Sequence, residues 1–450
     1  MFRDDTIAAI STPPGRGGIG VVRLSGPRAV EIANAVFQSR SLAALSPNRA
    51  QFGHLLNPAT KERIDEIVLT FFKAPRSYTG EDVIELSCHG SPVILRRALD
   101  AVIACGARIA EPGEFTFRAF FNHRIDLAQA QAVRDLIDAQ TEYQARVASR
   151  QIAGALSQRL APAKQSVIDI IVQLESSVEF VEDDISTEAI SLLLRKLNEA
   201  IADLTRIAAS FSFGRFVREG FDLAIVGRPN VGKSSVFNRL TGSERAIVTP
   251  LPGTTRDALY ESASIGGVPV RLIDTAGIRE TTDVVETIGI RRSRAAIADA
   301  DIALLILDAS EPLTEDDRRL LAEVPAERRI VAINKIDLGE MESPVIGAIR
   351  ISALTGSGFD QLTARMIERL SDDASSERDD LMITDARQHS AIRRAIEQLE
   401  GARDLITEGE FEEIILLRLR GALSSLGEVT GETLTEDILN EIFSTFCVGK

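Results

Sequence analysis

The chain has 450 residues and a formal net charge of −15. A chain of this length is too long for one hydrophobic core, so two or three domains are expected. The acidic balance argues against a protein that coats nucleic acid nonspecifically, so any RNA contact needs a local patch or a partner. Cys88, Cys105 and Cys447 are too few and too far apart for a disulfide framework or a zinc site.

Neither a signal peptide nor a membrane span is evident. The first residues, MFRDD, lack the features of a signal peptide, and no apolar run reaches the length that spans a bilayer. We therefore expect a soluble protein of a reducing compartment, which is the bacterial cytoplasm or an organelle matrix, without a membrane partner; of the two we predict the cytoplasm.

Residues 1–118 mix strand-like runs with helical stretches, which is the pattern of an α+β domain. Strands are expected at 6–11, 20–24, 67–72 and 83–86, and helices at 28–37 and 91–104. A glycine cluster at 15–20 precedes a strand rather than opening a helix. It is therefore not the dinucleotide-binding fingerprint.

Residues 119–215 have helical periodicity and predict an all-α domain. Two apolar faces consist of Val167, Ile170, Leu174 and Val178, and of Ile190, Leu194, Leu197, Ile201, Leu204 and Ala208. After a polar, acidic linker at 371–380, Ile392, Ile396, Leu399 and Ile406 recur at helical spacing. Neither helical stretch can bury its apolar stripe alone, so we expect residues 377–450 to pack against residues 119–215.

Between the two helical stretches, residues 216–376 carry the pattern of an α/β domain. The predicted fold is multidomain, α+β and α/β: an N-terminal α+β domain, an all-α domain, and a P-loop domain with a mixed sheet flanked by helices. The P-loop domain is inserted into the helical domain, a position from which nucleotide-driven motion can reach the helices.

The most informative stretch is GRPNVGKSS at residues 227–235. It follows an apolar run at 223–226 and precedes a helical pattern, which is the context of a phosphate-binding loop. The glycines let backbone N–H groups converge on an anion, and the helix N-terminus adds its positive dipole end. Lys233 is expected to reach the β- and γ-phosphates, and Ser234 to hold Mg²⁺. The loop thus predicts binding of a nucleoside triphosphate.

Four further segments follow at strand ends: GTTRD at 253–257, DTAG at 274–277, NKID at 334–337 and SAL at 352–354. With the phosphate loop, they resemble the translation-factor-like GTPases. The resemblance implies that Asp337 pairs with the guanine N1–H and 2-amino groups. It also implies that Asp274 holds Mg²⁺ through water and that Thr255 coordinates it directly. We therefore predict a GTPase, whose expected GTP contacts are Asn230, Val231, Gly232, Lys233, Ser234, Ser235, Thr249, Thr254, Thr255, Asp274, Thr275, Ala276, Gly277, Asn334, Lys335, Asp337, Ser352 and Ala353.

The machinery for hydrolysis differs from that of many small GTPases. Those enzymes orient the attacking water with a glutamine after the DxxG motif, where this chain has Ile278. No arginine finger can be named. Asn230 offers a side-chain oxygen at the phosphates as a ligand for a monovalent cation, or else stabilises a turn. Spacing leaves three candidates for orienting the water: Glu280, Asp283 and Glu286.

The two ends of the chain carry further signatures. The N-terminal ones are DTIAAISTP at 5–13, GGIGVVRLSG at 17–26, SYTGED at 77–82, EPGEFT at 111–116 and NHRIDL at 122–127; the chain ends CVGK at 447–450. The ending does not fit a prenylation signal. Together with the GTPase motifs, these signatures cover essentially the whole chain. They resemble the MnmE (TrmE) family, GTPases that modify the wobble uridine of certain tRNAs.

The resemblance implies an N-terminal domain that mediates a homodimer and binds 5,10-methylenetetrahydrofolate or a related reduced folate. The family's folate contacts match Arg23, Glu81, Arg124 and Lys450. Arginines suit the carboxylates of the folate glutamate tail, and Glu81 suits the amino and ring N–H groups of the pterin. Arg124 stands where many members of the family carry lysine.

The resemblance further implies K⁺ in place of an arginine finger, which accounts for Ile278 because a fixed cation also stabilises the developing charge. Glu286 matches the family's water-orienting glutamate and Cys447 its functional terminal cysteine. The residues that match the K⁺ ligands are Asn230, Thr249, Leu251 and Thr254.

The implied reaction adds a carboxymethylaminomethyl or aminomethyl group to C5 of uridine-34 in tRNA. The implied partner is the flavin-dependent MnmG (GidA), in a heterotetramer or larger complex. FAD is expected on that partner, since this chain lacks a dinucleotide fingerprint. GTP hydrolysis then closes and opens facing GTPase domains. Two other hypotheses remain: a ribosome-assembly GTPase without folate chemistry, and a regulatory GTPase whose N-terminal domain only dimerises.

Overall fold

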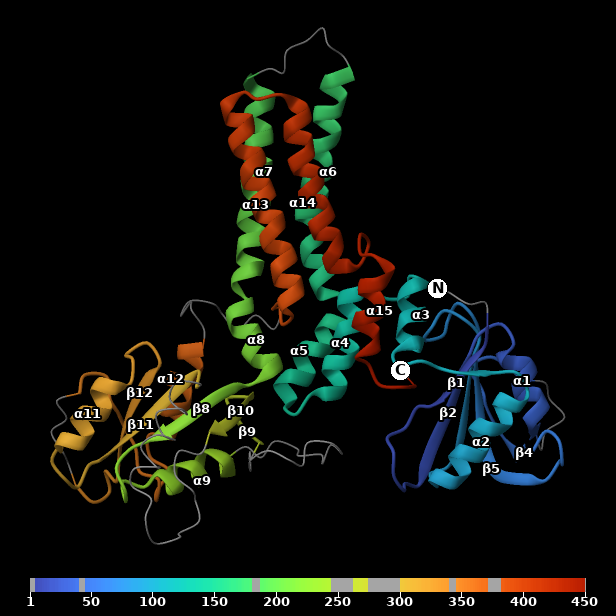
Figure 1. The fold of residues 1–450 in the computed structure, drawn as a ribbon, viewed down its shortest axis with the longest axis horizontal. Coiled ribbons are helices and arrows are strands. Elements are labelled where there is room, and N and C mark those ends of the chain that lie inside the picture. The colour runs from blue at the N-terminus through green and yellow to red at the C-terminus, as the bar shows by residue number, and fades with distance from the viewer. Residues whose placement is uncertain are drawn as a thin grey trace. The chain divides into compact units, whose positions relative to one another are not determined.

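The computed structural model describes residues 5–39, 45–179, 187–243, 262–273, 300–339, 345–370 and 382–449. It divides into two compact units (Figure 1). The first consists of Met1–Arg134 with Gly427–Lys450, and the second of Asp135–Leu426. No helix in the described ranges is both long and apolar enough to cross a lipid bilayer.

The described part of the first unit contains a seven-stranded sheet in the order β3-β4-β5-β6-β2-β1-β7. Its strands are β1 Ile7–Ile10, β2 Ile19–Ser25, β3 Phe37–Ser39, β4 Ala50–Leu56, β5 Arg63–Phe72, β6 Val83–His89 and β7 Arg108–Ile109. Strands β1, β2, β5 and β6 confirm the four strands expected from the sequence. Strand β4 was not expected, because Gly53 and His54 interrupt its apolar residues.

Helices α1 (Ala29–Val36) and α2 (Pro92–Ala104) pack on one face of this sheet. They confirm the two helices predicted in this part of the sequence. Alternation along β2 places Leu24 in the core with Ile32 of α1 and Leu99 of α2. Arg23 therefore points to the opposite face of the sheet.

The C-terminal segment packs within the same unit. Helix α15 (Glu436–Ser444) contacts α3 (Glu114–Phe121), which is followed by α4 (Leu127–Asp138). The ring of Phe443 lies edge-on to Phe117, with centroids 5.3 Å apart, and Phe446 lies 5.3 Å from Phe443. These aromatic contacts fix the end of the chain against the N-terminal domain.

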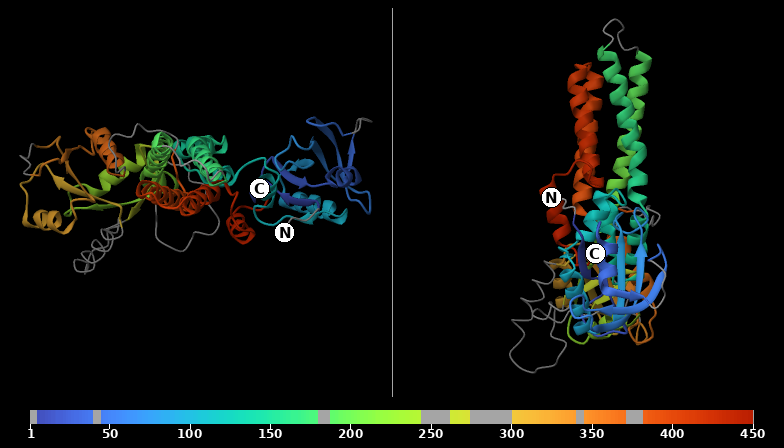
Figure 2. Two further views of the ribbon diagram at one scale, coloured as in Figure 1. Left: turned by 90° about the horizontal axis from the view of Figure 1, so that it is seen from above. Right: turned by 90° about the vertical axis from the view of Figure 1, so that its right-hand side faces the viewer.

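The second unit contains a bundle of long helices (Figures 1 and 2). Its helices are α5 Glu142–Ile152, α6 Ala155–Glu179, α7 Thr187–Ala209, α8 Phe211–Glu219, α13 Ala386–Glu408 and α14 Glu412–Thr430. Helix α13 packs on α7, and α14 is tied to α6 by an ion pair between Arg420 and Glu175 at 2.6 Å. The C-terminal helices therefore pack against the earlier ones, as predicted from their apolar stripes.

Within its described residues, the second unit also has a six-stranded sheet in the order β13-β12-β11-β8-β10-β9. The strands are β8 Phe221–Val226, β9 Ser262–Ile265, β10 Val268–Ile273, β11 Ile302–Asp308, β12 Arg329–Asn334 and β13 Ile349–Arg350. All neighbours are parallel except β9 and β10, so the sheet is mixed, as predicted.

This sheet is buried on both faces. Every residue of β11 is buried, as is typical of a parallel strand between two layers of helix. Leu304 and Leu305 belong to different core clusters, one on each side. The described flanking helices are α9 Lys233–Ser243, α11 Glu315–Glu323 and α12 Phe359–Leu370. The sheet lies between α8 and α13 in the chain, as expected for a domain inserted into the helical one.

Candidate functional site

The phosphate-binding loop predicted from the sequence connects the end of β8 to the start of α9. Gly232 has φ +96°, and a Cβ there would lie 2.3 Å from the side-chain nitrogen of Asn334. Only glycine fits both the backbone conformation and the space. The carbonyl of Gly232 accepts a hydrogen bond from the N–H of Val236 at 2.9 Å, which continues the loop into the helix.

Lys233 is held inside this loop. Its Nζ donates to the carbonyl oxygens of Gly227 at 2.8 Å and Arg228 at 2.7 Å. Burial lowers the pKa of Lys233, because the charged ammonium is partly removed from water. The loop thus holds the Lys233 ammonium near the N-terminus of α9, a position that favours binding of an anion.

Asn334 joins two of the sequence motifs. It lies at the end of β12, is buried, and donates from Nδ2 to the carbonyl oxygen of Val231 at 2.9 Å. Its Oδ1 accepts from the N–H of Ala353 at 2.9 Å. Ser352 in turn donates to Oδ1 of Asp337 at 2.5 Å. The phosphate loop and the two segments predicted to bind guanine therefore meet at the carboxyl ends of β8, β12 and β13, where ligands of open α/β sheets bind.

Two supporting acids were not found from the sequence. Asp308, at the end of β11, accepts from Nζ of Lys335 at 2.6 Å. Burial by itself raises the pKa of Asp308, but Lys335 and Ser310 outweigh this and lower it overall. Asp317 accepts from Nε of Arg228 at 2.9 Å. In the sequence, Asp308 is visible as an acid at a strand end and Asp317 as part of the capping box of α11. Neither pattern predicts which basic residue the acid pairs with.

Asn230, Ser234 and Ser235 lie at the exposed surface of the loop, and Asn230 has φ +65°. Lys450 lies outside the described residues. So do the other residues predicted to bind the nucleotide, Mg²⁺ or K⁺ or to orient the water, which are Thr249, Leu251, Thr254, Thr255, Asp274, Thr275, Ala276, Gly277 and Glu286.

Arg23 lies at the centre of a second group of polar side chains. Its Nε and Nη2 both donate to Oε1 of Glu85 on the neighbouring strand β6, at 3.0 and 2.8 Å. The guanidinium carbon lies 5.7 Å from the ring centroid of Tyr78 and 5.8 Å from that of Phe115. Glu85 was not among the residues predicted from the sequence.

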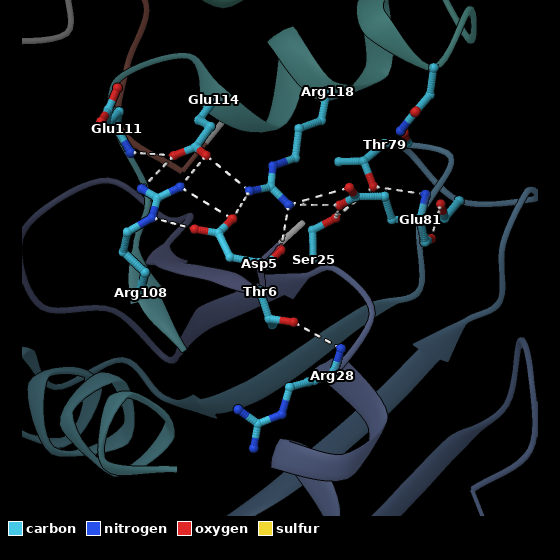
Figure 3. Close-up of polar contacts among 12 residues, drawn as sticks. Asp5, Thr6, Ser25, Arg28, Thr79, Glu81, Arg108, Glu111, Glu114 and Arg118 are labelled. Atoms are coloured by element: carbon cyan, nitrogen blue, oxygen red, sulfur yellow. Dashed lines mark hydrogen bonds and ion pairs between the residues drawn. The ribbon is translucent and has the colours of Figure 1, made fainter. Parts of the chain in front are cut away.

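Glu81 is held by Ser25 and Arg118 (Figure 3). The hydroxyl of Ser25 donates to Oε2 of Glu81 at 2.7 Å, and Nη1 of Arg118 lies 3.3 and 3.2 Å from Oε1 and Oε2. Arg124 is exposed, and its side chain packs against Gly80, next to Glu81. Three of the four residues predicted to bind folate therefore lie on the same unit, with side chains from β2, the loop before β6 and the turn after α3.

The C-terminal tail reaches this group. The carbonyl of Gly449 accepts from Nη1 of Arg23 at 3.4 Å. Gly449 has φ +94°, and a Cβ there would lie 2.5 Å from the carbonyl oxygen of Ile10 on β1. The carbonyl of Cys447, whose side chain is exposed, accepts from the N–H of Gly113 at 3.3 Å. The N-terminal and C-terminal signatures thus lie together in space.

The sequence also matches known proteins along its full length. The family model described as the MnmE helical domain matches residues 127–447, and that of the GTP-binding protein TrmE N-terminus matches residues 6–124. The tRNA modification GTPase MnmE of Koribacter versatilis is 47% identical over the full length of both chains. That of Aquifex aeolicus is 43% identical over 99% of this chain and 100% of the relative. The chain belongs to the MnmE family of tRNA modification GTPases.

Proposed function

We propose that this protein hydrolyses GTP to modify C5 of the wobble uridine of tRNA with a carboxymethylaminomethyl or aminomethyl group. GTP binding is supported by two hydrogen bonds of the Asn334 side chain, which donates to the carbonyl of Val231 and accepts from the N–H of Ala353. They join the phosphate loop to the predicted guanine-binding segments. Full-length similarity to tRNA modification GTPases supports the choice of substrate.

In the nucleotide site, we assign roles both to described residues and to predicted residues outside the described ranges. The loop backbone and Lys233 hold the phosphates, and the hydroxyl of Ser234 holds Mg²⁺, which supplies charge neutralisation when bound. The carboxylate of Asp337, oriented by Ser352, selects guanine by accepting from its N1–H and 2-amino groups. Asn230 contributes a K⁺ ligand together with Thr249, Leu251 and Thr254, and Glu286 orients the water.

The N-terminal unit is the proposed folate site. The donor set fits this ligand, because the Arg23 guanidinium lies near the rings of Tyr78 and Phe115 and Glu81 presents an acceptor for a pterin. A folate carboxylate would share the Arg23 guanidinium with Glu85. Reduced folate supplies the one-carbon unit, and Arg124 and Lys450 complete its contacts. We also propose that the exposed Cys447 takes part in the reaction as a catalytic residue.

The assembly proposed around this chain is a homodimer that works with the flavin-dependent partner MnmG in the cytoplasm. The partner carries FAD. An acidic chain that acts on tRNA also suits a partner that supplies positive surface for the RNA backbone.

Calorimetric titration with 5-formyltetrahydrofolate tests the folate part. Saturable binding to the wild-type protein that is lost in Arg23→Ala would support one-carbon chemistry. The absence of binding by folded wild type would reduce the N-terminal domain to a dimerisation module and would favour a ribosome-assembly GTPase.

Measuring the rate of GTP hydrolysis in K⁺ and in Na⁺ tests the nucleotide part. We expect faster hydrolysis in K⁺, and loss of this preference in Asn230→Ala with GTP binding retained. Equal rates in the two salts would remove the cation from the proposal.

A further inference from the structure

Glu81 belongs to a cluster of partly buried ionic side chains around Arg118 (Figure 3). Its two arginines are Arg108 on β7 and Arg118 on α3, and its carboxylates are Asp5, Glu81 and Glu114. The Arg118 side chain is 3% exposed, so its charge must be balanced by neighbours. Burial by itself lowers the pKa of Arg118, but the surrounding carboxylates outweigh this and raise it. Arg118 is therefore a permanent buried cation.

The two terminal nitrogens of Arg118 face different partners. Nη2 donates to Oδ1 of Asp5 at 2.5 Å and to Oε1 of Glu114 at 3.0 Å. Nη1 donates to the backbone carbonyl of Asp5 at 2.8 Å and lies within 3.3 Å of both oxygens of Glu81. One planar guanidinium thus connects the segment before β1 and α3 to the loop that carries Glu81.

Glu81 retains room for a further donor. Within the described part of the chain, Ser25 and Arg118 are the side chains that bond to its carboxylate, and the side chain is 15% exposed. Ser25 is itself paired with Thr79 at 2.6 Å, in a buried contact. A carboxylate has about four acceptor positions. Among the described residues, Oε1 has one side-chain contact, to Arg118 at 3.3 Å, so it can still accept from a ligand.

We propose that Arg118 is a positioning residue for folate binding: it anchors the Glu81 carboxylate from the protein interior and thereby orients it toward the pterin. The inference rests on the proposed function, because it requires Glu81 to contact the folate. Arg118 itself has no contact with the ligand and acts only through Glu81.

Arg108 provides the matched control. It donates to Asp5 at 2.7 Å and to Glu114 at 2.6 Å, so it belongs to the same ionic cluster. Among the residues that the structure describes, Arg108 makes no bond to Glu81. When Arg108 is replaced, we expect Asp5 and Glu114 to keep their bonds to Arg118. If the variants only loosen the cluster, replacing either arginine should weaken folate binding. If Arg118 positions Glu81, only the Arg118 variant should weaken it.

The test is a double-mutant cycle on the full-length protein, with the Kd for 5-formyltetrahydrofolate measured by calorimetry. Arg118→Gln and Glu81→Gln should each weaken binding by about tenfold or more, because each breaks a charge-assisted contact. The double variant should bind no more weakly than Glu81→Gln alone, within about twofold. Arg108→Gln should stay within about threefold of wild type and should add to Glu81→Gln.

Arg118→Lys covers the case in which Arg118→Gln does not fold. It keeps the buried positive charge, but a single ammonium cannot bridge Asp5, Glu114 and Glu81 in the fixed geometry of the guanidinium. We expect weaker binding than wild type, again without additivity to Glu81→Gln.

Three results would overturn the inference: wild-type affinity in the Arg118 variants, full additivity with Glu81→Gln, or an equal loss in Arg108→Gln. If the wild-type protein binds no folate, the proposed folate function itself fails. If wild type binds folate and Glu81→Gln does not, the proposed folate function stands. The affinities of the Arg118 single variants for folate then test the inference.

Discussion

At the scale of single residues, Arg228 links the buried carboxylate of Asp317 to Lys233, the lysine proposed to bind phosphate. Its carbonyl accepts from Lys233, and its guanidinium donates to Asp317 at 2.9 Å and to Glu311 at 3.1 Å. Asp317 is 3% exposed and also accepts from the backbone and hydroxyl of Thr314. The shape of the loop therefore depends on an acid that lies 89 positions further along the chain.

We expect Asp317→Asn to lower the free energy of unfolding by about 1–3 kcal/mol, because it weakens a buried ion pair and a helix cap together. Glu311→Gln is the control, since Glu311 binds the same arginine but is 57% exposed and should change stability by less than about 0.5 kcal/mol. Urea-induced unfolding measures both. Equal effects of the two variants would contradict this account of the loop.

At the scale of elements, α8 connects the helical bundle to the sheet. Arg218, in its last turn, donates to Asp135 at 2.9 Å and to Asp385, the N-cap of α13, at 2.6 Å. Burial alone lowers the pKa of Arg218, but these two carboxylates raise it overall. The strand that leads to the phosphate loop begins two residues after α8 ends. Motion of that loop can therefore reach the bundle through a short, tightly anchored connection.

Gly214 allows α8 to pack closely against the segment before α13. A Cβ at this position would lie 2.0 Å from the carbonyl oxygen of Ile383. Gly214→Ala should therefore destabilise the protein by about 1–3 kcal/mol, because backbone must move. Gly242→Ala, in α9 with nothing within 4 Å, should instead stabilise it by about 0.5–1 kcal/mol. Thermal unfolding of the two variants would refute the packing argument if both shifted Tm in the same direction.

His389 gives the same region a dependence on pH. Its ring stacks on Phe211 of α8, with centroids 4.4 Å apart, and burial together with Arg393 lowers the pKa of His389 below 6.5. The folded state therefore disfavours the proton that the unfolded chain accepts. This contribution to stability is fully present above pH 6.5 and is lost as the pH falls through the lowered pKa.

We predict that His389→Phe, which keeps the stacking, makes the free energy of unfolding decline less between about pH 6.5 and pH 5. Urea titrations at several pH values measure this slope. A variant whose slope equals that of wild type would show that other groups cause the acid-side loss.

Locally determined features could be predicted from the sequence. The strands β1, β2, β5 and β6, the apolar face of α13 and the order of the nucleotide motifs follow from periodicity and glycine spacing. The partners of those residues could not be predicted, because they come from distant positions: Arg118 meets the Asp5 backbone across 113 positions, and Arg23 meets Gly449 across 426. The exact buried face of a helix could not be predicted either, because Leu193 is buried in α7, whereas the predicted apolar face contained Leu194.

At the scale of the whole molecule, the chain combines a nucleotide site and a second polar site on separate compact units. The C-terminal tail belongs to the unit that holds Arg23 and Glu81, although most of the chain separates them in sequence. The proposed division into segments 1–118, 119–215, 216–376 and 377–450 remains a prediction. We propose that both units serve one reaction on tRNA and that this reaction requires GTP hydrolysis.

The most direct test measures the wobble nucleosides of tRNA by mass spectrometry in a strain that lacks this gene. The strain is complemented with wild type or with Lys233→Ala at matched protein levels. We predict that wild type restores the modified uridine and that Lys233→Ala does not, because the variant loop lacks the ammonium group proposed to hold the phosphates. Full modification with Lys233→Ala, or in the strain without any copy, would contradict the claim.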